Sequence, residues 1–127
     1  MNDARRLVID WGSRTVLTEA GEYVNLHAEL DRCGQERLKS EHNLHVAEGE
    51  WRGAQGKAWL DYRARDGGEK RSVAELDKMV DRDVILPETP VGHAWQTLLA
   101  AQARAKADAE QYWTLKRLVD LDIKYMT

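Results

Sequence analysis

Two long stretches of the chain place apolar or small residues in alternating steps of three and four, the spacing that gathers side chains on one face of an α-helix. The first stretch extends from about residue 19 to residue 65 and contains no proline. Its series is Tyr23, Leu26, Leu30, Cys33, Arg37, Ser40, Leu44, Ala47, Trp51, Ala54, Ala58 and Tyr62. The second stretch extends from about residue 91 to residue 125, and its series is Trp95, Leu98, Gln102, Ala105, Ala109, Tyr112, Lys116, Val119 and Ile123. We therefore predict two long amphipathic helices.

The first helix has weaker signals at its ends and in its interior. Either Thr15 or Thr18 can cap its N-terminus, because a threonine hydroxyl accepts a hydrogen bond from a free backbone N–H group. Each interior glycine costs about 1 kcal/mol relative to alanine, so we expect a break near residues 49–56. The glycines at residues 67–68 end the helix. Upstream, the apolar run at residues 7–13 predicts either a short strand or a hydrophobic arm that docks on a neighbour.

A short helix is predicted between the two long ones. Ser72 and Glu75 form the capping box S-x-x-E that opens a helix, and four apolar residues lie on one face of that helix: Val73, Leu76, Met79 and Val80. The prolines at positions 87 and 90 make residues 81–89 an extended connector. The predicted fold class is all-α, a long helical hairpin with a short middle helix, a long C-terminal oligomerisation helix and a short N-terminal arm.

The chain of 127 residues is predicted to form a single domain. An N-terminal arm (1–15) precedes a part with the first long helix, the short helix and the connector (16–90), and an assembly helix (91–127) follows. The assembly helix extends over about 50 Å at about 1.5 Å per residue, and too little chain lies beside it to cover its seam. We predict that copies of the chain assemble through Trp95, Leu98, Leu99, Gln102, Ala105, Ala109, Tyr112, Trp113, Val119 and Ile123.

The sequence offers no ingredients for catalysis. Cys33 is the only cysteine, which excludes an intrachain disulfide and a cysteine-based zinc site. His42 and His45 have the wrong spacing for a zincin pair, and there is no nucleophile elbow, P-loop or dinucleotide fingerprint. We therefore predict a protein that is not an enzyme and that has no catalytic residue, metal or cofactor. No apolar run is long enough for a signal peptide or a membrane span, so we expect a cytoplasmic protein without a membrane partner.

Charge is distributed unevenly along the chain. The net charge of −3 argues mildly against a dedicated nucleic-acid binder. However, residues 52–71 hold six basic against three acidic side chains, whereas residues 75–88 hold five acidic against two basic ones. Basic side chains interleaved with aromatic ones can bind single-stranded nucleic acid, because cations neutralise phosphates and aromatic faces stack on bases. The candidate DNA-binding residues are Arg52, Lys57, Trp59, Tyr62, Arg63, Arg65, Lys70 and Arg71. The alternative is a helix end whose aromatic side chains pack inward and whose charges are merely solvated.

Four short motifs also follow one another in a characteristic order. They are E-A-x-x-x-V-x-L at residues 19–26, K-A-x-L-D-Y at residues 57–62 before a basic loop with glycines, D-x-D-V at residues 81–84 and W-x-x-L-L at residues 95–99. Through these motifs the chain resembles, over about residues 15–125, the UvsY family of recombination mediators from T4-type bacteriophages. Trp59 departs from the family pattern, which has a second basic residue there.

The resemblance implies a non-catalytic protein that binds single-stranded DNA as a homo-oligomeric ring of roughly six to eight subunits. Such a mediator helps to load a RecA-like recombinase while the single-strand DNA-binding protein is displaced. In this family the C-terminal helices build the ring, and Lys57 falls on a basic position where DNA contact is expected. The alternative is a non-enzymatic helical phage adaptor, chaperone or inhibitor that self-assembles without binding DNA.

The two hypotheses differ in the surroundings of the basic residues. In a mediator, Lys57, Arg63 and Arg65 share an exposed face. In an adaptor they pair with nearby acidic residues and their charges cancel; the acidic residues are Asp61, Asp66 and Glu69.

Overall fold

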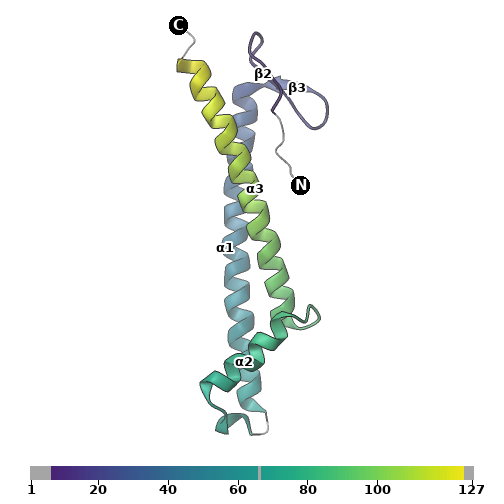
Figure 1. Cartoon of the computed structure of the whole chain (residues 1–127), viewed down its shortest axis with the longest axis vertical. Helices are drawn as coiled ribbons and strands as arrows, with labels where there is room; N and C mark the ends of the chain where they lie inside the picture. Colours follow the sequence, from purple (N-terminus) through teal and green to yellow (C-terminus); the bar gives the residue numbers. More distant parts are fainter. Residues whose placement is uncertain (1–6, 66, 125–127) are drawn as a thin grey trace. The chain divides into compact units, whose positions relative to one another are not determined.

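The computed structural model describes residues 7–65 and 67–124, and this part of the chain contains three α-helices and a small antiparallel sheet (Figure 1). The helices are α1 (Leu26–Ala64), α2 (Val73–Val84) and α3 (Pro90–Lys124). The strands are β1 (Ile9–Asp10), β2 (Thr15–Leu17) and β3 (Tyr23–Asn25), and a 3₁₀ turn, η1 (Gly68–Lys70), precedes α2. The predicted helical class, with two long helices, a short middle helix and a short N-terminal arm, is confirmed. Tyr125, the predicted end of the last helix, lies outside the described residues.

The chain forms two compact units. Unit 1 combines the N-terminal segment as far as Lys39 with the C-terminal segment from Lys106, and unit 2 is Ser40–Ala105. Both α1 and α3 contribute to each unit, and within each unit the two helices lie side by side and run in opposite directions (Figure 1). None of the helices in the described parts of the chain is long and apolar enough to cross a membrane.

The core of unit 1 lies where the sheet meets α1 and α3. Its buried members are Val16, Leu26, Cys33, Leu115 and Val119, with Leu7, Ile9, Val24, Leu30 and Tyr112 packed against them. The central strand β2 pairs with both neighbours and places Val16 opposite Ile9 and Val24. The apolar run at residues 7–13 therefore contains a short strand, and Ile9 packs on the core of its own chain.

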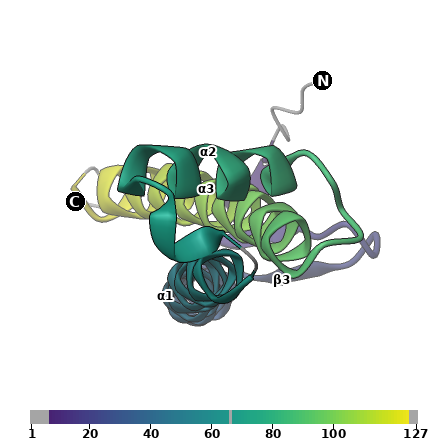
Figure 2. The same ribbon diagram turned by 90° about the horizontal axis from the view of Figure 1, so that it is seen from below.

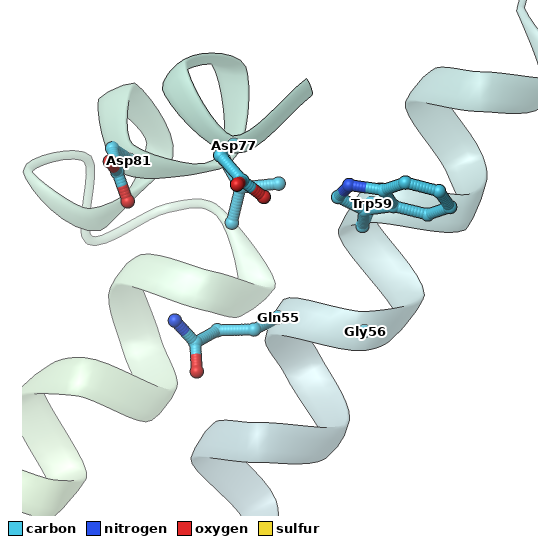
Figure 3. Close-up of a pocket in the computed structure, with 6 residues that line it drawn as sticks. Gln55, Gly56, Trp59, Asp77 and Asp81 are labelled. Carbon is cyan, nitrogen blue, oxygen red and sulfur yellow. The ribbon is translucent and has the colours of Figure 1, made fainter. Parts of the chain in front are cut away.

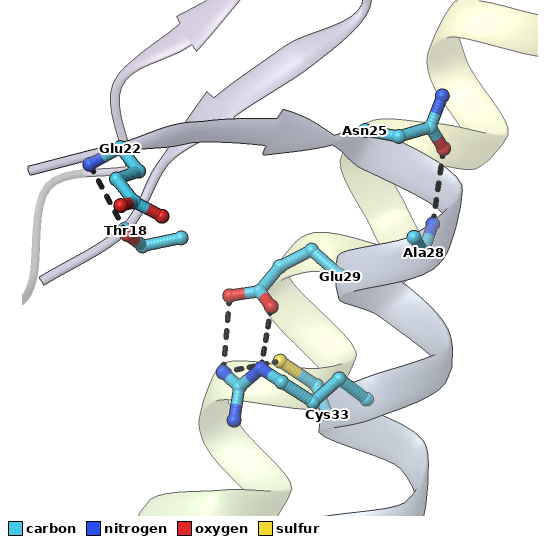
Figure 4. A network of polar contacts seen from close by, with 7 residues as sticks. Thr18, Glu22, Asn25, Ala28, Glu29 and Cys33 are labelled. Atoms are coloured by element: carbon cyan, nitrogen blue, oxygen red, sulfur yellow. Dashed lines mark hydrogen bonds and ion pairs between the residues drawn. The ribbon is translucent and has the colours of Figure 1, made fainter. Parts of the chain in front are cut away.

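An ion pair between a buried carboxylate and an exposed guanidinium lies beside this core (Figure 4). Glu29 is only 8% exposed, and Arg32 donates to both of its carboxylate oxygens, with Nη2 and Oε2 3.0 Å apart. The pairing compensates a charge that would otherwise be costly to bury. Burial also raises the pKa of the Cys33 thiol, so this cysteine is poorly reactive.

The predicted start of the first helix is wrong. Residues expected at its beginning form β2, a turn and β3, and α1 begins only at Leu26. Neither Thr15 nor Thr18 caps it; Asn25 does, because its side-chain oxygen accepts a hydrogen bond from the Ala28 backbone N–H over 3.0 Å (Figure 4). Threonine, valine and tyrosine favour strands, and Gly21 supplies the positive φ of 83° that the turn between β2 and β3 requires.

The expected break near residues 49–56 is also absent, because α1 is continuous from Leu26 to Ala64. A side chain added at Gly49, Gly53 or Gly56 would meet nothing within 4 Å. The three glycines are thus exposed with free space beside them, while Ala47 is buried and Trp51 packs on Trp95 of α3 with ring centres 4.9 Å apart. Packing of one face sustains the helix despite the weak intrinsic propensity of the other. Gly67, with φ 75°, follows the end of α1.

The N-terminal cap of α2 was predicted correctly, since the Ser72 hydroxyl accepts a hydrogen bond from the Glu75 backbone N–H over 3.2 Å. Leu76 and Val80 are buried as expected, but Val73 is exposed. Within unit 2, α2 runs crosswise to the end of α1 (Figure 2). The extended connector predicted from residue 81 is wrong, because α2 continues to Val84.

A short connector with a threonine at its centre joins α2 to α3. The Thr89 hydroxyl lies 2.8 Å from the carbonyl oxygens of Asp83 and Leu86 and accepts a hydrogen bond from the Gly92 N–H over 2.9 Å. Thr89 therefore caps α3, which begins at Pro90, a residue suited to the first helical position.

We predicted that the chain itself would not cover the assembly face of α3. This is wrong for about half of the residues of that face, which pack on other parts of the same chain. Leu98, Ala105 and Val119 are buried within the chain. Trp95 packs on Trp51, and Tyr112 lies under the Arg37 guanidinium at 4.9 Å. The remaining seam residues range from half-buried to exposed: Ala109 is half-buried, and Leu99, Gln102, Trp113 and Ile123 are exposed.

Candidate nucleic-acid interface

The predicted basic residues all lie in unit 2, at the C-terminal part of α1 and in the segment that leads to α2. Arg52, Lys57 and Arg63 belong to α1, and Arg65, Lys70 and Arg71 follow it. All six side chains are exposed. Arg63 lies in the last turn of α1, where the carbonyl ends of the helix favour a positive charge.

Most of these cations have no acidic partner among the described residues. Arg52 forms an exposed ion pair with Glu48 at 3.4 Å, a contact that is weak in water. Among the described residues, the structure shows no ion pair for the other five, which are Lys57, Arg63, Arg65, Lys70 and Arg71. The described acidic neighbours Asp61 and Glu69 do not pair with them, and Asp66 lies outside the described residues. No described carboxylate therefore neutralises these five charges.

The aromatic members of the cluster have partners within the chain. The Arg63 guanidinium lies 5.5 Å from the centre of the Trp59 ring, and the Arg65 guanidinium lies 4.6 Å from the centre of the Tyr62 ring. The Tyr62 hydroxyl donates to the Asp83 carboxylate of α2, with O–O distances of 2.8 and 3.0 Å. Tyr62 thus ties the end of α1 to α2, and the Arg65 guanidinium lies over its ring.

The hydrogen bond to Asp83 gives a prediction for Tyr62. It raises the pKa of the Tyr62 phenol, because the carboxylate accepts the proton that ionisation would remove. Tyr62→Phe should lower the free energy of unfolding by about 1 kcal/mol at neutral pH. The difference from wild type should disappear at alkaline pH. The pKa of Tyr62 is higher in the folded than in the unfolded protein, where it is about 10. The hydrogen bond therefore stabilises the folded protein fully below the unfolded-state pKa, and this stabilisation is lost as the pH rises through the folded-state pKa.

Urea unfolding followed across this pH range measures the effect of Tyr62→Phe. Tyr23→Phe is the matched control, because Tyr23 is exposed and its hydroxyl forms no hydrogen bond with a described residue. Equal stabilities of Tyr62→Phe and Tyr23→Phe at neutral pH would contradict a stabilising role of the contact with Asp83.

An open cavity of about 430 Å³ lies beside Trp59 and has an acidic wall (Figure 3). Residues of α1 and α2 line it: Gln55, Gly56, Trp59, Asp77, Val80 and Asp81. Carboxylates repel phosphates, so the side of Trp59 that faces this cavity is unfavourable for DNA. The predicted cations and aromatic rings therefore lie close together at the end of α1, with Arg63 over Trp59 and Arg65 over Tyr62, and Trp59 also borders the acidic cavity.

The described part of the chain holds no cluster of three or more His, Cys, Asp or Glu side chains that could bind a metal ion. His42 and His45 are both exposed on α1. Comparison with known proteins found no family model, no curated protein and no solved structure that matches the chain. The fold and this surface define its class only as a small, predominantly helical protein with a solvated basic segment beside an acidic helix.

Proposed function

We propose that the chain is a non-enzymatic protein that binds single-stranded DNA and acts as a recombination mediator. In this role it assembles into a ring and helps a RecA-like recombinase to replace the single-strand DNA-binding protein. One observation supports DNA binding above all: five cations around the end of α1 are exposed and form no ion pair with the described residues. The ordered motifs shared with the UvsY family support the mediator role.

Exposed cations that no described carboxylate neutralises favour a polyanion, because binding releases the counterions that surround the nucleic acid. The rest of the surface is acidic enough to give a net charge of −3, and α2 adds carboxylates close to the basic segment. A phosphate backbone would therefore be attracted to the end of α1 and repelled elsewhere. Such an arrangement aligns the DNA along one strip of the protein.

The DNA affinity should fall steeply with salt. For single-stranded DNA, the logarithm of the binding constant falls with the logarithm of the salt concentration by about 0.7 for each phosphate that is neutralised. With about four phosphates neutralised, the affinity should drop roughly 50-fold between about 50 and 200 mM salt. Fluorescence anisotropy of a labelled oligonucleotide measures this dependence. Lys57→Ala combined with Arg63→Ala should weaken binding at low salt by about tenfold and make the slope shallower.

A charge-matched control separates a defined surface from general attraction. Lys39→Ala combined with Lys106→Ala removes the same charge from two exposed lysines outside the basic segment. This control should bind DNA like wild type. Equal losses in both double variants, or a wild-type protein that does not bind an oligonucleotide at low salt, would refute the proposed surface. If the double variant Lys57→Ala with Arg63→Ala no longer forms the oligomer, these two side chains contribute to assembly.

The exposed apolar side chains of α3 favour a second candidate, a helical adaptor, chaperone or inhibitor that self-assembles and ignores DNA. Trp113 and Ile123 are each 53% exposed, and Leu121 is 43% exposed, all in unit 1. Light scattering with and without oligonucleotide distinguishes the candidates. An oligomer whose mass, and whose change of mass with salt, are the same with and without the oligonucleotide supports the adaptor candidate.

A further inference from the structure

The C-terminal part of α3, in unit 1, carries an open hollow of about 510 Å³, the α3 hollow. Its lining residues recur every three or four positions and therefore share one face of the helix. The buried Leu115 and Val119 lie on the opposite face, so the hollow faces away from the core of unit 1. The lining residues are Trp113, Lys116, Arg117, Asp120, Leu121 and Lys124.

The α3 hollow combines exposed apolar surface with positive charge. Trp113 is 53% exposed although the Arg37 guanidinium lies 5.5 Å from its ring centre, and Leu121 is 43% exposed. The lining has three basic side chains and one acidic one, and Arg117 is exposed without an ion pair to any described residue. Tryptophan and arginine are enriched among the side chains that dominate protein interfaces. The hollow therefore suits an apolar side chain that an acidic segment carries.

The same chain presents such a segment in unit 2. Ile85 is 79% exposed, the largest exposed fraction of any large apolar side chain among the described residues, and Leu86 is 40% exposed. Both lie in the connector between α2 and α3, residues 85–89, which projects as a loop (Figure 1). Residues 75–88 hold five acidic against two basic side chains. By contrast, the exposed Leu60 lies among the cations of α1 and would bring like charges to the hollow.

Hydrogen bonds order the connector before any partner arrives. The Leu86 N–H donates to the Asp83 carbonyl over 3.0 Å, and the Thr89 N–H donates to the Leu86 carbonyl over 3.0 Å. The Thr89 hydroxyl also contacts both carbonyl oxygens. The backbone that carries Ile85 therefore loses little conformational freedom on association, which favours binding.

We propose that the connector of one copy of the chain docks in the α3 hollow of a second copy, with Ile85 against Trp113 and Leu121. The acidic residues near the connector then face the basic side chains of the hollow. Because the contact joins two unlike surfaces, each copy can use its hollow for one neighbour and its connector for another, and such contacts form a ring when the rotation closes. The inference rests on the self-assembly that the proposed function includes, and it names the two surfaces that meet.

Three full-length variants that make the same kind of change test this contact. Ile85→Lys alters the connector and Leu121→Lys alters the hollow. Leu38→Lys is the control, because Leu38 is 58% exposed and lies outside both surfaces. Sedimentation equilibrium gives the dissociation constant of the assembly, and circular dichroism verifies the fold. The first two variants should each raise the constant roughly tenfold or more, whereas the control should leave it unchanged.

A mixture of the two weakened variants distinguishes unlike from like surfaces. Ile85→Lys retains an intact hollow, and Leu121→Lys retains an intact connector. At a concentration at which each variant alone is monomeric, the equimolar mixture should therefore contain particles with the mass of two copies. A mixture no heavier than its components overturns the proposal. Wild-type protein that does not assemble, or Ile85→Lys that assembles like wild type, overturns it as well.

Reversal of one charge tests the electrostatic part of the contact. Arg117→Glu should weaken assembly roughly tenfold. Lys106→Glu, which makes the same change of charge at an exposed position of α3 outside the hollow, should not. Equal effects of the two variants would contradict an acidic occupant.

Oligonucleotide binding, measured on the same samples, separates this inference from the proposed function. If wild type binds the oligonucleotide and Ile85→Lys assembles normally, the docking contact is refuted and the DNA-binding proposal stands. If assembly depends on Ile85 and Leu121 but wild type does not bind the oligonucleotide, the docking contact stands and the DNA-binding proposal is refuted.

Discussion

Replacing Gly92 with alanine is expected to lower the free energy of unfolding by about 3 kcal/mol, at the upper end of the cost of overpacking. A β-carbon at this position would lie 1.9 Å from the Leu86 carbonyl oxygen and 2.8 Å from that of Asp83. Both obstacles are backbone atoms, one in the last turn of α2 and one in the connector after it, so no side-chain rotation relieves the clash. The connector itself must move.

Movement of that connector would disrupt several contacts together. Thr89 caps α3 through the Gly92 N–H and contacts the carbonyl groups of Asp83 and Leu86. Asp83 in turn accepts the hydrogen bond that ties Tyr62 to α2. Gly92→Ala should therefore weaken both the cap of α3 and the attachment of α2 to α1.

Urea unfolding of Gly92→Ala measures this loss. Gly49→Ala is the natural comparison, since it makes the same chemical change in a helix where the added methyl meets nothing within 4 Å. We expect opposite signs for the two variants. A loss below about 1 kcal/mol for Gly92→Ala would mean that the connector adapts easily and that its approach to α3 is not fixed.

Replacing Gly49, Gly53 and Gly56 together with alanine is expected to raise the free energy of unfolding by about 3 kcal/mol, from about 1 kcal/mol for each glycine in a helix interior. All three lie within α1, and none would bring its new methyl group within 4 Å of another part of the chain. The gain arises because alanine restricts the unfolded chain more than glycine does and helps to shield the helical backbone.

The triple variant also tests whether the three glycines lie in a contact between copies of the chain. The stability gain is expected only if each glycine has free space beside it in the assembled protein as well. Unfolding in urea gives the stability, and light scattering gives the mass. A stability gain with unchanged mass is the expected pair of results. A loss of stability together with a lower mass would contradict the expectation, since it would place the glycines in a close contact between copies.

The helical periodicity of the sequence was enough to predict α3 and most of α1, because one packed face repeats over many turns. The N-terminal sheet was missed for a specific reason. Tyr23 fits the helical series that continues into Leu26, yet β-branched neighbours and Gly21 favour a tight turn between strands. Asn25 is a good cap, but its position inside an apparent helix concealed it.

Composition located the cationic segment of the candidate site, but it did not determine the surroundings of the aromatic rings. The contact between Tyr62 and Asp83 spans 21 residues and depends on the path of the chain through η1 and α2. The same is true of the cavity, where Trp59 meets Asp77 and Asp81 only because α2 folds back across the end of α1 (Figure 3). The periodicity of one helix does not indicate whether a later helix will pack across its end.

The aromatic pairs give each unit an optical signature of its own. In unit 2 the indoles of Trp51 and Trp95 lie 4.9 Å apart with their planes tilted by 47°, an arrangement in which their electronic transitions couple and produce a circular-dichroism couplet. Unit 1 has a mixed phenol–indole pair, Tyr112 and Trp113, at the same separation but nearly perpendicular, with an interplanar angle of 79°. Because the chromophores differ, a single thermal melt recorded by circular dichroism can follow the loss of order in the two halves separately.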